Sequence, residues 1–368
     1  MKTKIFSGMI IALAILALFS SIGLASASPD HGTNGYGSTC NGAVYTIDNA
    51  AAGNNVIKYD RDANGFLTLA GTFSTNGLGT GSHLASQGAV VLTNNDHWLL
   101  VVDAGSNQIS VFKLGSTLTF TDKVCSDGTM PVSITVHDDI VYVLNAGGTP
   151  DIAGFYLSNN GKLFPIMGSI KPLSGVANSQ PEQIGFNNDG NVLVVTEVGA
   201  NNIDTYTVNW AGVASWPMVH ASNGPGPYGF AFDEKGFLVV SEAGTGTLSS
   251  YKVSDNGDLK LISGSVPDYG LAPCWVAIGE NGLVYASNAH GGTISDYQIM
   301  NSGKLVLIRS VDATVNIPGL DLAFSAGGNF LYNLNGNSIT GFWVHHDGDL
   351  SEITSVSVPS STTGLAAC

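Results

Sequence analysis

The sequence predicts an all-β protein, a seven-bladed β-propeller with four antiparallel strands in each blade. Of its 368 residues, 47 are Gly and only 11% are charged, although 44% are hydrophobic. This composition favours tight turns and leaves few charged side chains for exposed helix faces. A unit of four short strands recurs along the chain, and the glycine of one of its turns returns every 45 to 51 residues, a period typical of propeller blades. These turn glycines are Gly65, Gly115, Gly161, Gly212, Gly257, Gly303 and Gly348.

Residues 1–27 have the pattern of a signal peptide. Lys2 and Lys4 precede an unbroken apolar run, and Ala25-Ser26-Ala27 fits a cleavage site. The run is short for a membrane span of about 20 residues, although an uncleaved anchor is the alternative. We therefore expect a secreted or otherwise extracytoplasmic protein without an integral membrane segment after cleavage. Residues 28–39 form a short Gly-rich lead, and residues 40–368 form the propeller.

Each unit presents its four strands in the same order. In the sixth unit the leading strand starts at a proline and covers residues 273–278. An Asn-Gly turn leads to the hydrophobic second strand, 284–288, which ends in a polar residue. The third strand, 294–297, ends in Tyr, and the turn Ser302-Gly-Lys-Leu305 opens the fourth strand. The regular return of this order favours a propeller over a flat sandwich of sheets.

The two ends of the predicted propeller complement each other. The first unit starts at 43–48 without a leading strand, while 363–368 resembles a leading strand with nothing after it. We expect the C-terminal strand to complete the first blade and close the ring, which removes a free sheet edge. This geometry places Cys368 beside Cys40 and predicts a disulfide between them. Cys125 and Cys274 fall in blades two and six, and we expect buried thiols there, with a bridge as the alternative.

The strand Val141-Tyr-Val-Leu-Asn145 and the turn Asn160-Gly-Lys-Leu163 carry a family resemblance. With their repeats, they make the chain similar to the seven-bladed lactonase family of 6-phosphogluconolactonases and 3-carboxymuconate cyclases. The resemblance covers essentially the whole mature chain. It implies a small lactone or related ligand at the channel mouth, where the inner strands begin. Fold alone does not fix activity, so the site residues must decide it.

The sequence departs from the family at the residues expected to do chemistry. Family enzymes commonly begin a middle blade with Gly-Pro-Arg-His, but this chain has Gln180-Pro-Glu-Gln183. Val198 stands where a Glu is common, and Ala289 replaces an expected Arg, with His290 next. The family's Arg and His residues are therefore mostly absent, and the chain is either an altered lactonase or a binding propeller without catalysis.

The charge of the chain restricts its partners. Its net charge is −15, and it becomes −17 when Lys2 and Lys4 leave with the signal peptide. Nucleic acid is excluded as a partner because phosphate backbones are bound by Lys and Arg. Few cations fall near the expected ligand face, so a neutral lactone or carbohydrate suits it better than an anionic one. We expect a monomer.

Polar residues at the ends of the second strands form a sevenfold set. Its Asp and Asn members are expected to cap the following turns. Glu197 and Glu242 stand out because Glu is a poorer turn cap, and two close carboxylates could act as acid and base or bind a divalent cation. Two solvated glutamates are the alternative. His290 is a candidate general base. No dedicated metal site and no organic cofactor are expected. The set is Asp48, Asp103, Asn145, Glu197, Glu242, Asn288 and Asn335.

Residues near the starts of the inner strands are the candidate ligand-binding set. They combine aromatic rings with amides and carboxyl groups, which suits stacking and hydrogen bonding to a neutral sugar or lactone. Ordinary packing of loops over the blades is the alternative. The candidates are Gln87, Glu182, Gln183, Tyr228, Trp275 and Asp321.

Overall fold

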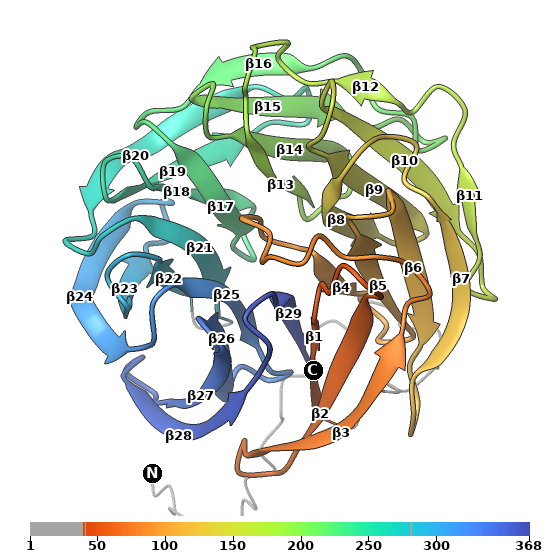
Figure 1. Cartoon of the computed structure of the whole chain (residues 1–368). Helices are drawn as coiled ribbons and strands as arrows, with labels where there is room; N and C mark the ends of the chain where they lie inside the picture. Colours follow the sequence, from red (N-terminus) through yellow and green to blue (C-terminus); the bar gives the residue numbers. More distant parts are fainter. Residues whose placement is uncertain (1–39, 41, 280–281) are drawn as a thin grey trace, which may run out of the picture. The chain divides into compact units, whose positions relative to one another are not determined.

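The computed structural model describes residues 40, 42–279 and 282–368, and it confirms the seven-bladed propeller. The signal peptide and Gly-rich lead predicted for residues 1–39 lie outside this part. Seven antiparallel sheets surround a central channel (Figure 1). Among the described residues there is no helix long and apolar enough to cross a membrane.

Each blade runs from an inner strand at the channel to an outer strand at the rim. From blade 1 to blade 7, the inner strands are β29 (Thr363–Ala367), β4 (Val90–Leu92), β8 (Pro131–His137), β13 (Pro181–Phe186), β17 (Pro227–Phe232), β21 (Pro273–Ile278) and β25 (Gly319–Phe324). The second strands are β1 (Ala43–Ile47), β5 (Trp98–Asp103), β9 (Ile140–Asn145), β14 (Val192–Glu197), β18 (Phe237–Glu242), β22 (Leu283–Asn288) and β26 (Phe330–Asn335).

The outer half of each blade is built in the same way. The third strands are β2 (Asn55–Arg61), β6 (Gln108–Lys113), β10 (Asp151–Leu157), β15 (Asn202–Thr207), β19 (Thr247–Val253), β23 (Thr293–Ile299) and β27 (Ser338–Val344). The fourth strands are β3 (Leu67–Ser74), β7 (Thr119–Cys125), β11 (Leu163–Pro165) with β12 (Lys171–Pro172), β16 (Met218–Ala221), β20 (Leu259–Pro267), β24 (Leu305–Thr314) and β28 (Leu350–Ser357).

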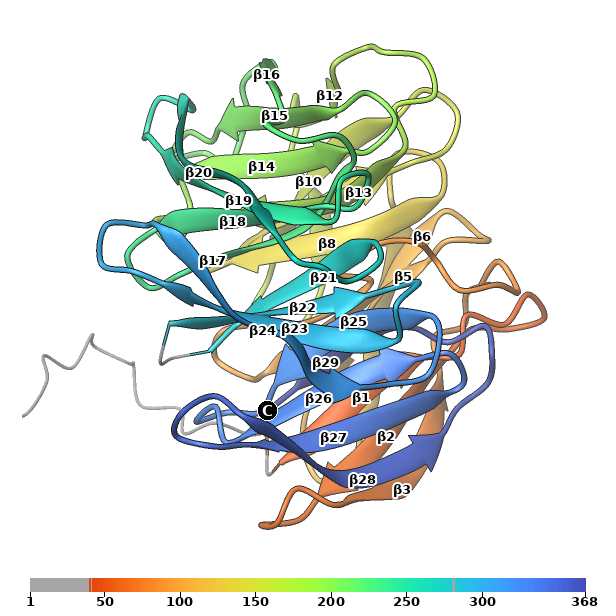
Figure 2. The same cartoon turned by 90° about the vertical axis from the view of Figure 1, so that its left-hand side faces the viewer.

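The hydrophobic core lies between the faces of neighbouring blades, which stack in side view (Figure 2). Second strands are buried on both faces, so β5 is an unbroken run of buried residues. In the rim strands β3 and β28 only the first residue is buried, and the others are exposed or partly exposed. Tyrosines of three second strands also donate to the turn-glycine carbonyl of the next blade. The pairs are Tyr142 with Gly212, Tyr285 with Gly348 and Tyr332 with Gly65, at 2.7 to 2.8 Å.

The ring closes as the sequence predicts. β29 pairs antiparallel with β1, with Val44 opposite Ala367, and so supplies the inner strand of blade 1. Cys40 and Cys368 form the predicted disulfide, with their Cα atoms 6.2 Å apart. The amide of Cys368 also donates to the carbonyl of Ala43.

The other two cysteines are free thiols and differ in exposure. Cys274 lies on β21 and is buried, as expected. The expectation of a buried thiol is wrong for Cys125, which ends the outer strand β7 and is exposed. Fourth strands form the rim of a blade, so a residue there has no neighbouring strand to cover it.

Candidate functional site

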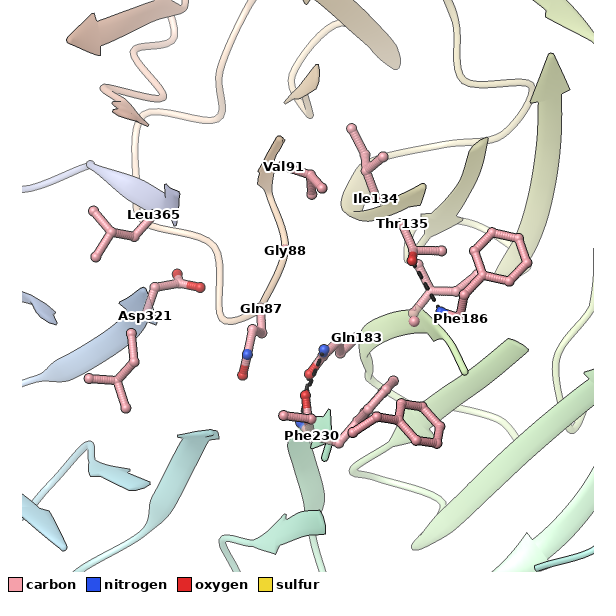
Figure 3. Close-up of a pocket in the computed structure, with 15 residues that line it drawn as sticks. Gln87, Gly88, Val91, Ile134, Thr135, Gln183, Phe186, Phe230, Asp321 and Leu365 are labelled. Carbon is pink, nitrogen blue, oxygen red and sulfur yellow. Dashed lines mark hydrogen bonds between the residues drawn. The ribbon is translucent and has the colours of Figure 1, made fainter. Parts of the chain in front are cut away.

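A cavity of about 280 Å³ lies in the central channel (Figure 3). Its wall continues to Phe186 and Phe232, the last residues of β13 and β17, so it extends toward the face where the inner strands end. This volume lies just below the range of about 300–1,000 Å³ typical of small-molecule sites. The lining residues are Gln87, Gly88, Val91, Ile134, Thr135, Gln183, Ile184, Gly185, Phe186, Phe230, Ala231, Phe232, Asp321, Leu322 and Leu365.

A segment that we call the strap, residues 83–88, reaches across the channel from the connection between β3 and β4 (Figure 1). The side-chain amide of Gln87 donates to the carbonyl of Val276 on blade 6 at 2.8 Å and accepts from the Val276 amide at 3.1 Å. The indole of Trp275 donates to the carbonyl of Ser86 at 3.0 Å. The strap therefore joins blades on opposite sides of the ring.

Gln183 makes a similar link between neighbouring blades. Its side chain accepts from the amide of Phe230 at 2.7 Å and donates to the carbonyl of the same residue at 3.0 Å (Figure 3). Gln87 and Gln183, two of the candidate ligand-binding residues, line the cavity, but their amides already bond backbone groups of other blades. A ligand in the cavity would therefore contact these two side chains at amide oxygen and nitrogen atoms that already have a hydrogen-bond partner.

Asp321 on β25 is the one charged side chain among the cavity-lining residues. It is 3% exposed, and Figure 3 shows its carboxyl group directed toward the cavity. Burial raises the pKa of Asp321 to about 7, although the backbone amides of Gly364 and Gly88 bond the carboxylate and oppose this rise. A carboxyl group of this pKa can take up and release a proton near neutrality.

Thr135 on β8 is a polar lining residue that the sequence argument missed. Its hydroxyl oxygen accepts from the amide of Phe186 at 3.1 Å, which leaves its own hydrogen for a ligand (Figure 3). The sequence carries no strong signal for it because Thr is common in strands and usually packs there. Its place on an inner strand, facing the channel, is what makes it relevant.

The remaining predicted ligand-binding residues, Glu182, Tyr228 and Trp275, lie together but do not line the cavity. The rings of Tyr228 and Trp275 meet edge to face with centroids 5.2 Å apart, and both residues are buried. Burial raises the pKa of Glu182 to about 9, partly offset by a hydrogen bond with Tyr228. Burial also raises the pKa of the nearby Cys274 thiol to about 12. This cluster is therefore uncharged at neutral pH.

Glu242, a predicted catalytic residue, is fully buried within blade 5. Its carboxylate accepts from the amide of Gly224 at 2.8 Å and from the hydroxyls of Thr247, Ser249 and Ser265. A Cβ on Gly224 would lie 2.3 Å from Oε2, so only glycine fits over this carboxylate. The residue anchors the connection that arrives from blade 4.

The same anchoring occurs in other blades. Asp103 accepts from the hydroxyls of Thr75, at the end of blade 1, and Ser110 in its own blade. Asn145 donates to the carbonyl of Ser126, at the end of blade 2, at 3.1 Å. These members of the sevenfold set hold the connection from the preceding blade, a role beyond the turn capping that the sequence suggested.

Glu197, the other predicted catalytic carboxylate, is also fully buried, so the alternative of two solvated glutamates is wrong. One oxygen accepts from the amide of Ser174, at the end of blade 3, at 3.1 Å. Its carboxyl group also meets that of Asp204 on β15, and burial together with Glu197 raises the pKa of Asp204. Two buried carboxyl groups in contact favour sharing a proton.

A comparison of the repeats explains why this pair is unusual. Asp204 stands opposite Val195, two residues before the strand-end Glu197. Ser110 and Ser249 occupy the same register in blades 2 and 5, and their hydroxyls donate to the strand-end carboxylates. In blade 4 a carboxyl group replaces that donor. Alignment of the third strands was the sequence signal that would have revealed it.

The predicted catalytic residues are not brought together. Glu197 is paired within blade 4, Glu242 is enclosed by hydroxyls in blade 5, and neither lines the cavity. His290 is exposed in the turn between β22 and β23. Within the described ranges, no group of three or more His, Cys, Asp or Glu side chains could hold a metal ion.

Comparisons with known proteins support the fold. No protein-family model and no curated protein matches the chain significantly. Among solved structures, a periplasmic gluconolactonase from Pseudomonas aeruginosa is 16% identical, with a TM-score of 0.68 over 88% of this chain and 99% of that one. A Bacteroides fragilis protein provisionally assigned as a 6-phosphogluconolactonase is 15% identical, with a TM-score of 0.68 over 90% of this chain and 99% of that one.

A more distant structure is also similar. The virginiamycin B lyase from Staphylococcus aureus is 16% identical, with a TM-score of 0.56 over 75% of this chain and 86% of that one. At these identities the likeness concerns the fold alone, and the activity must be argued from the residues of the channel.

Proposed function

We propose that this protein is a lactonase-like propeller that opens or closes the ring of a small neutral lactone in the channel cavity, with Asp321 as the general base. The proposal depends on which ionisable side chains the cavity wall contains. The wall presents one carboxyl group with a pKa of about 7 and no cationic side chain among its lining residues. Anionic substrates would need Arg or Lys there, whereas a neutral lactone does not.

The hydrolytic direction can be written with this chain's own groups. The carboxylate of Asp321 takes a proton from a water molecule as its oxygen attacks the lactone carbonyl carbon. The Thr135 hydroxyl supplies a hydrogen bond to the oxygen that gains negative charge. The bond between the acyl carbon and the ring oxygen then breaks, and Asp321 returns the proton to that oxygen. The product is a hydroxy acid, whose carboxylate is disfavoured beside ionised Asp321 and leaves.

The neighbouring cluster supports a neutral substrate. Glu182 stands at the position where the resembling family carries an Arg, and with a pKa of about 9 it is uncharged at neutral pH. The exchange of a permanent cation for a neutral acid removes the group that would select phosphate or carboxylate. The roles predicted for Glu197, Glu242 and His290 remain predictions, since none of them lines the cavity.

Replacement of Asp321 tests the proposal. Hydrolysis of neutral aldonolactones should fall about 10²–10⁴-fold in Asp321→Asn, the usual effect of losing a general base. In the unchanged protein, kcat/KM should rise as the pH passes through about 7, because only the ionised carboxylate accepts the proton. A pH-stat measures both, after subtraction of the spontaneous rate.

Asp138→Asn is the matched control because its carboxylate is 87% exposed at the surface. It should leave the rate unchanged. If Asp321→Asn is folded by circular dichroism and still turns over at the original rate, Asp321 is not the base. No turnover of any neutral lactone by the unchanged protein would refute the catalytic proposal itself.

A binding module without catalysis is the second candidate, and one observation favours it. The amides of Gln87 and Gln183 are already engaged with backbone groups, which leaves few free donors for a developing oxyanion. This candidate predicts that neutral sugars or lactones raise the melting temperature without turnover. Export, which the signal pattern suggests and the disulfide supports, is part of either proposal.

A further inference from the structure

The rim of blades 3 and 4 exposes a set of large apolar side chains that neither proposed function uses. We call Tyr156, Phe164, Met167, Ile170, Trp210 and Trp216 the rim patch. Trp210 is 99% exposed, Met167 93% and Trp216 71%. Exposed apolar residues are common singly, but a contiguous group of this size marks an interaction site.

Contacts between the two blades show that the rim patch is continuous. The hydroxyl of Tyr142 on blade 3 donates to the carbonyl of Gly212 and accepts from the amide of Ala214, which holds the blade 4 turn containing Trp210 against blade 3. A Cβ added to Gly212 would lie 2.9 Å from Cδ1 of Ile166, the residue before Met167, so the two segments are close together. Figures 1 and 2 both place β12 and β16 side by side at this rim.

Two further contacts extend the patch along blade 3. Tyr156 stands opposite Phe164 in the pairing of β10 with β11. The Lys171 ammonium lies 5.6 Å from the centroid of the Trp216 ring, across the two blades. The patch therefore runs from the outer strand of blade 3 to the fourth-strand segment of blade 4.

These two segments lack the acidic side chains that are frequent in the rest of the chain. The chain has 28 Asp and Glu, yet none occurs in residues 152–181 or 205–232. The two cations of these segments are engaged, Lys162 with Asp122 at 3.3 Å and Lys171 with Trp216. The rim patch is thus nearly neutral on a molecule whose net charge is −15.

We propose that the rim patch is a self-association surface that joins two copies of this chain about a twofold axis. Two copies with this net charge repel each other wherever carboxylates face carboxylates. A twofold contact places the same patch on both sides, so the acid-free segments meet each other. Enrichment in Trp, Tyr, Phe and Met with depletion of acids is the composition of interface cores, and of homodimer interfaces above all.

The composition disfavours other occupants. An anionic bilayer would need free basic residues, whereas both lysines are engaged and the chain as a whole is acidic. A carbohydrate would need hydrogen-bond donors around the exposed rings, but Met167 and Ile170 are apolar. A dimer of this kind differs from the monomer that we expected from the sequence.

Sedimentation velocity of the purified protein, from about 1 to 100 μM, tests the proposal, because a dimer with a micromolar Kd forms within this range. We expect the unchanged protein to sediment as a dimer at the upper end, and added salt should favour the dimer because it screens the repulsion between two acidic copies. The double variant Trp210→Ser/Met167→Ser should sediment as a monomer, with a dissociation constant raised at least tenfold and an unchanged circular dichroism spectrum.

Trp343→Ser is the matched control because Trp343 is also partly exposed on an outer part of the propeller, in blade 7. It should leave the dimer intact. The proposal is overturned if the unchanged protein is a monomer at 100 μM, or if the dimer persists in the double variant. A monomer that co-sediments with phosphatidylcholine vesicles through Trp210 would also overturn it in favour of a lipid surface.

Discussion

At the scale of single residues, two buried glutamates that look alike in the sequence have opposite surroundings. Glu242 is satisfied by a backbone amide and three hydroxyls, which all donate to its carboxylate. Glu197 meets the carboxyl group of Asp204 instead, and the pKa of Asp204 rises through burial and this neighbour. The contrast arises from one position on the third strand, which is Ser249 in blade 5 and Asp204 in blade 4.

This contrast predicts how stability depends on pH. An acid whose pKa is raised by folding binds its proton more tightly in the folded state, so stability falls as pH rises above the unfolded value of about 4. Asp204→Ser, which copies blade 5, should therefore raise the melting temperature by a few degrees at pH 8 and less at pH 5. Thermal unfolding at the two pH values measures this difference.

The control for Asp204→Ser is Glu242→Gln, which should have the opposite effect. It replaces an acceptor oxygen with an NH₂ group that faces donors, and it should destabilise the fold by about 1–3 kcal/mol. A destabilised Asp204→Ser variant at pH 8 would show that the carboxyl pair is satisfied by some other interaction.

At the scale of elements, the strands and turns were predictable and the strap was not. Leading strands such as β21 begin at a proline, and turn glycines such as Gly303 recur with the repeat, so local chemistry specifies both. The strap belongs to the connection between β3 and β4, which has no counterpart in the other units. Its position depends on Gln87 meeting Val276, a pairing 189 residues apart that periodicity does not encode.

The strap gives a prediction at this scale. Gln87→Ala removes both side-chain bonds to Val276 and should destabilise the protein by about 1–3 kcal/mol, since a buried amide and carbonyl lose their partners. Hydrogen exchange of the Val276 amide should accelerate more than that of outer-strand amides. Gln298→Ala is the control, because Gln298 bonds backbone groups within blade 6 and the adjacent turn. Equal exchange of Val276 in both variants would contradict the role of the strap.

At the scale of the whole molecule, the ring depends on pairs far apart in the chain. β29 and β1 build blade 1 together, and the disulfide of Cys40 and Cys368 spans 328 residues. In the chain-entropy model, closing so long a loop stabilises the folded state by on the order of 5 kcal/mol.

Removal of this bridge should therefore affect the entire propeller. The double variant Cys40→Ser/Cys368→Ser should melt several degrees below the unchanged protein, and a reducing agent should lower the melting temperature of the unchanged protein to a similar value. Cys125→Ser should change nothing, because that thiol is free and exposed. A double variant as stable as the unchanged protein would show that β29 alone closes the ring.

Features that depend on the whole molecule were harder to predict from the sequence than the fold. The fold and its closure followed from the repeat, because the same strand order returns in each unit. Burial did not follow, so Glu197 and Glu242 could be placed at strand ends but not recognised as anchors between blades. Cross-channel contacts such as that of Gln87 with Val276 arise only when the seven units meet.

The closure of the ring at Cys40 and Cys368 makes the starting point of the chain interchangeable. Their Cα atoms are 6.2 Å apart, a gap that a linker of a few residues spans. Circular permutants that join these ends and begin instead at the turn of Gly161, Gly257 or Gly303 would keep every strand pair of the propeller. In each permutant, the blade that contains the new ends would be assembled from two segments distant in the chain. That blade, rather than blade 1, would then need a disulfide to join its two segments.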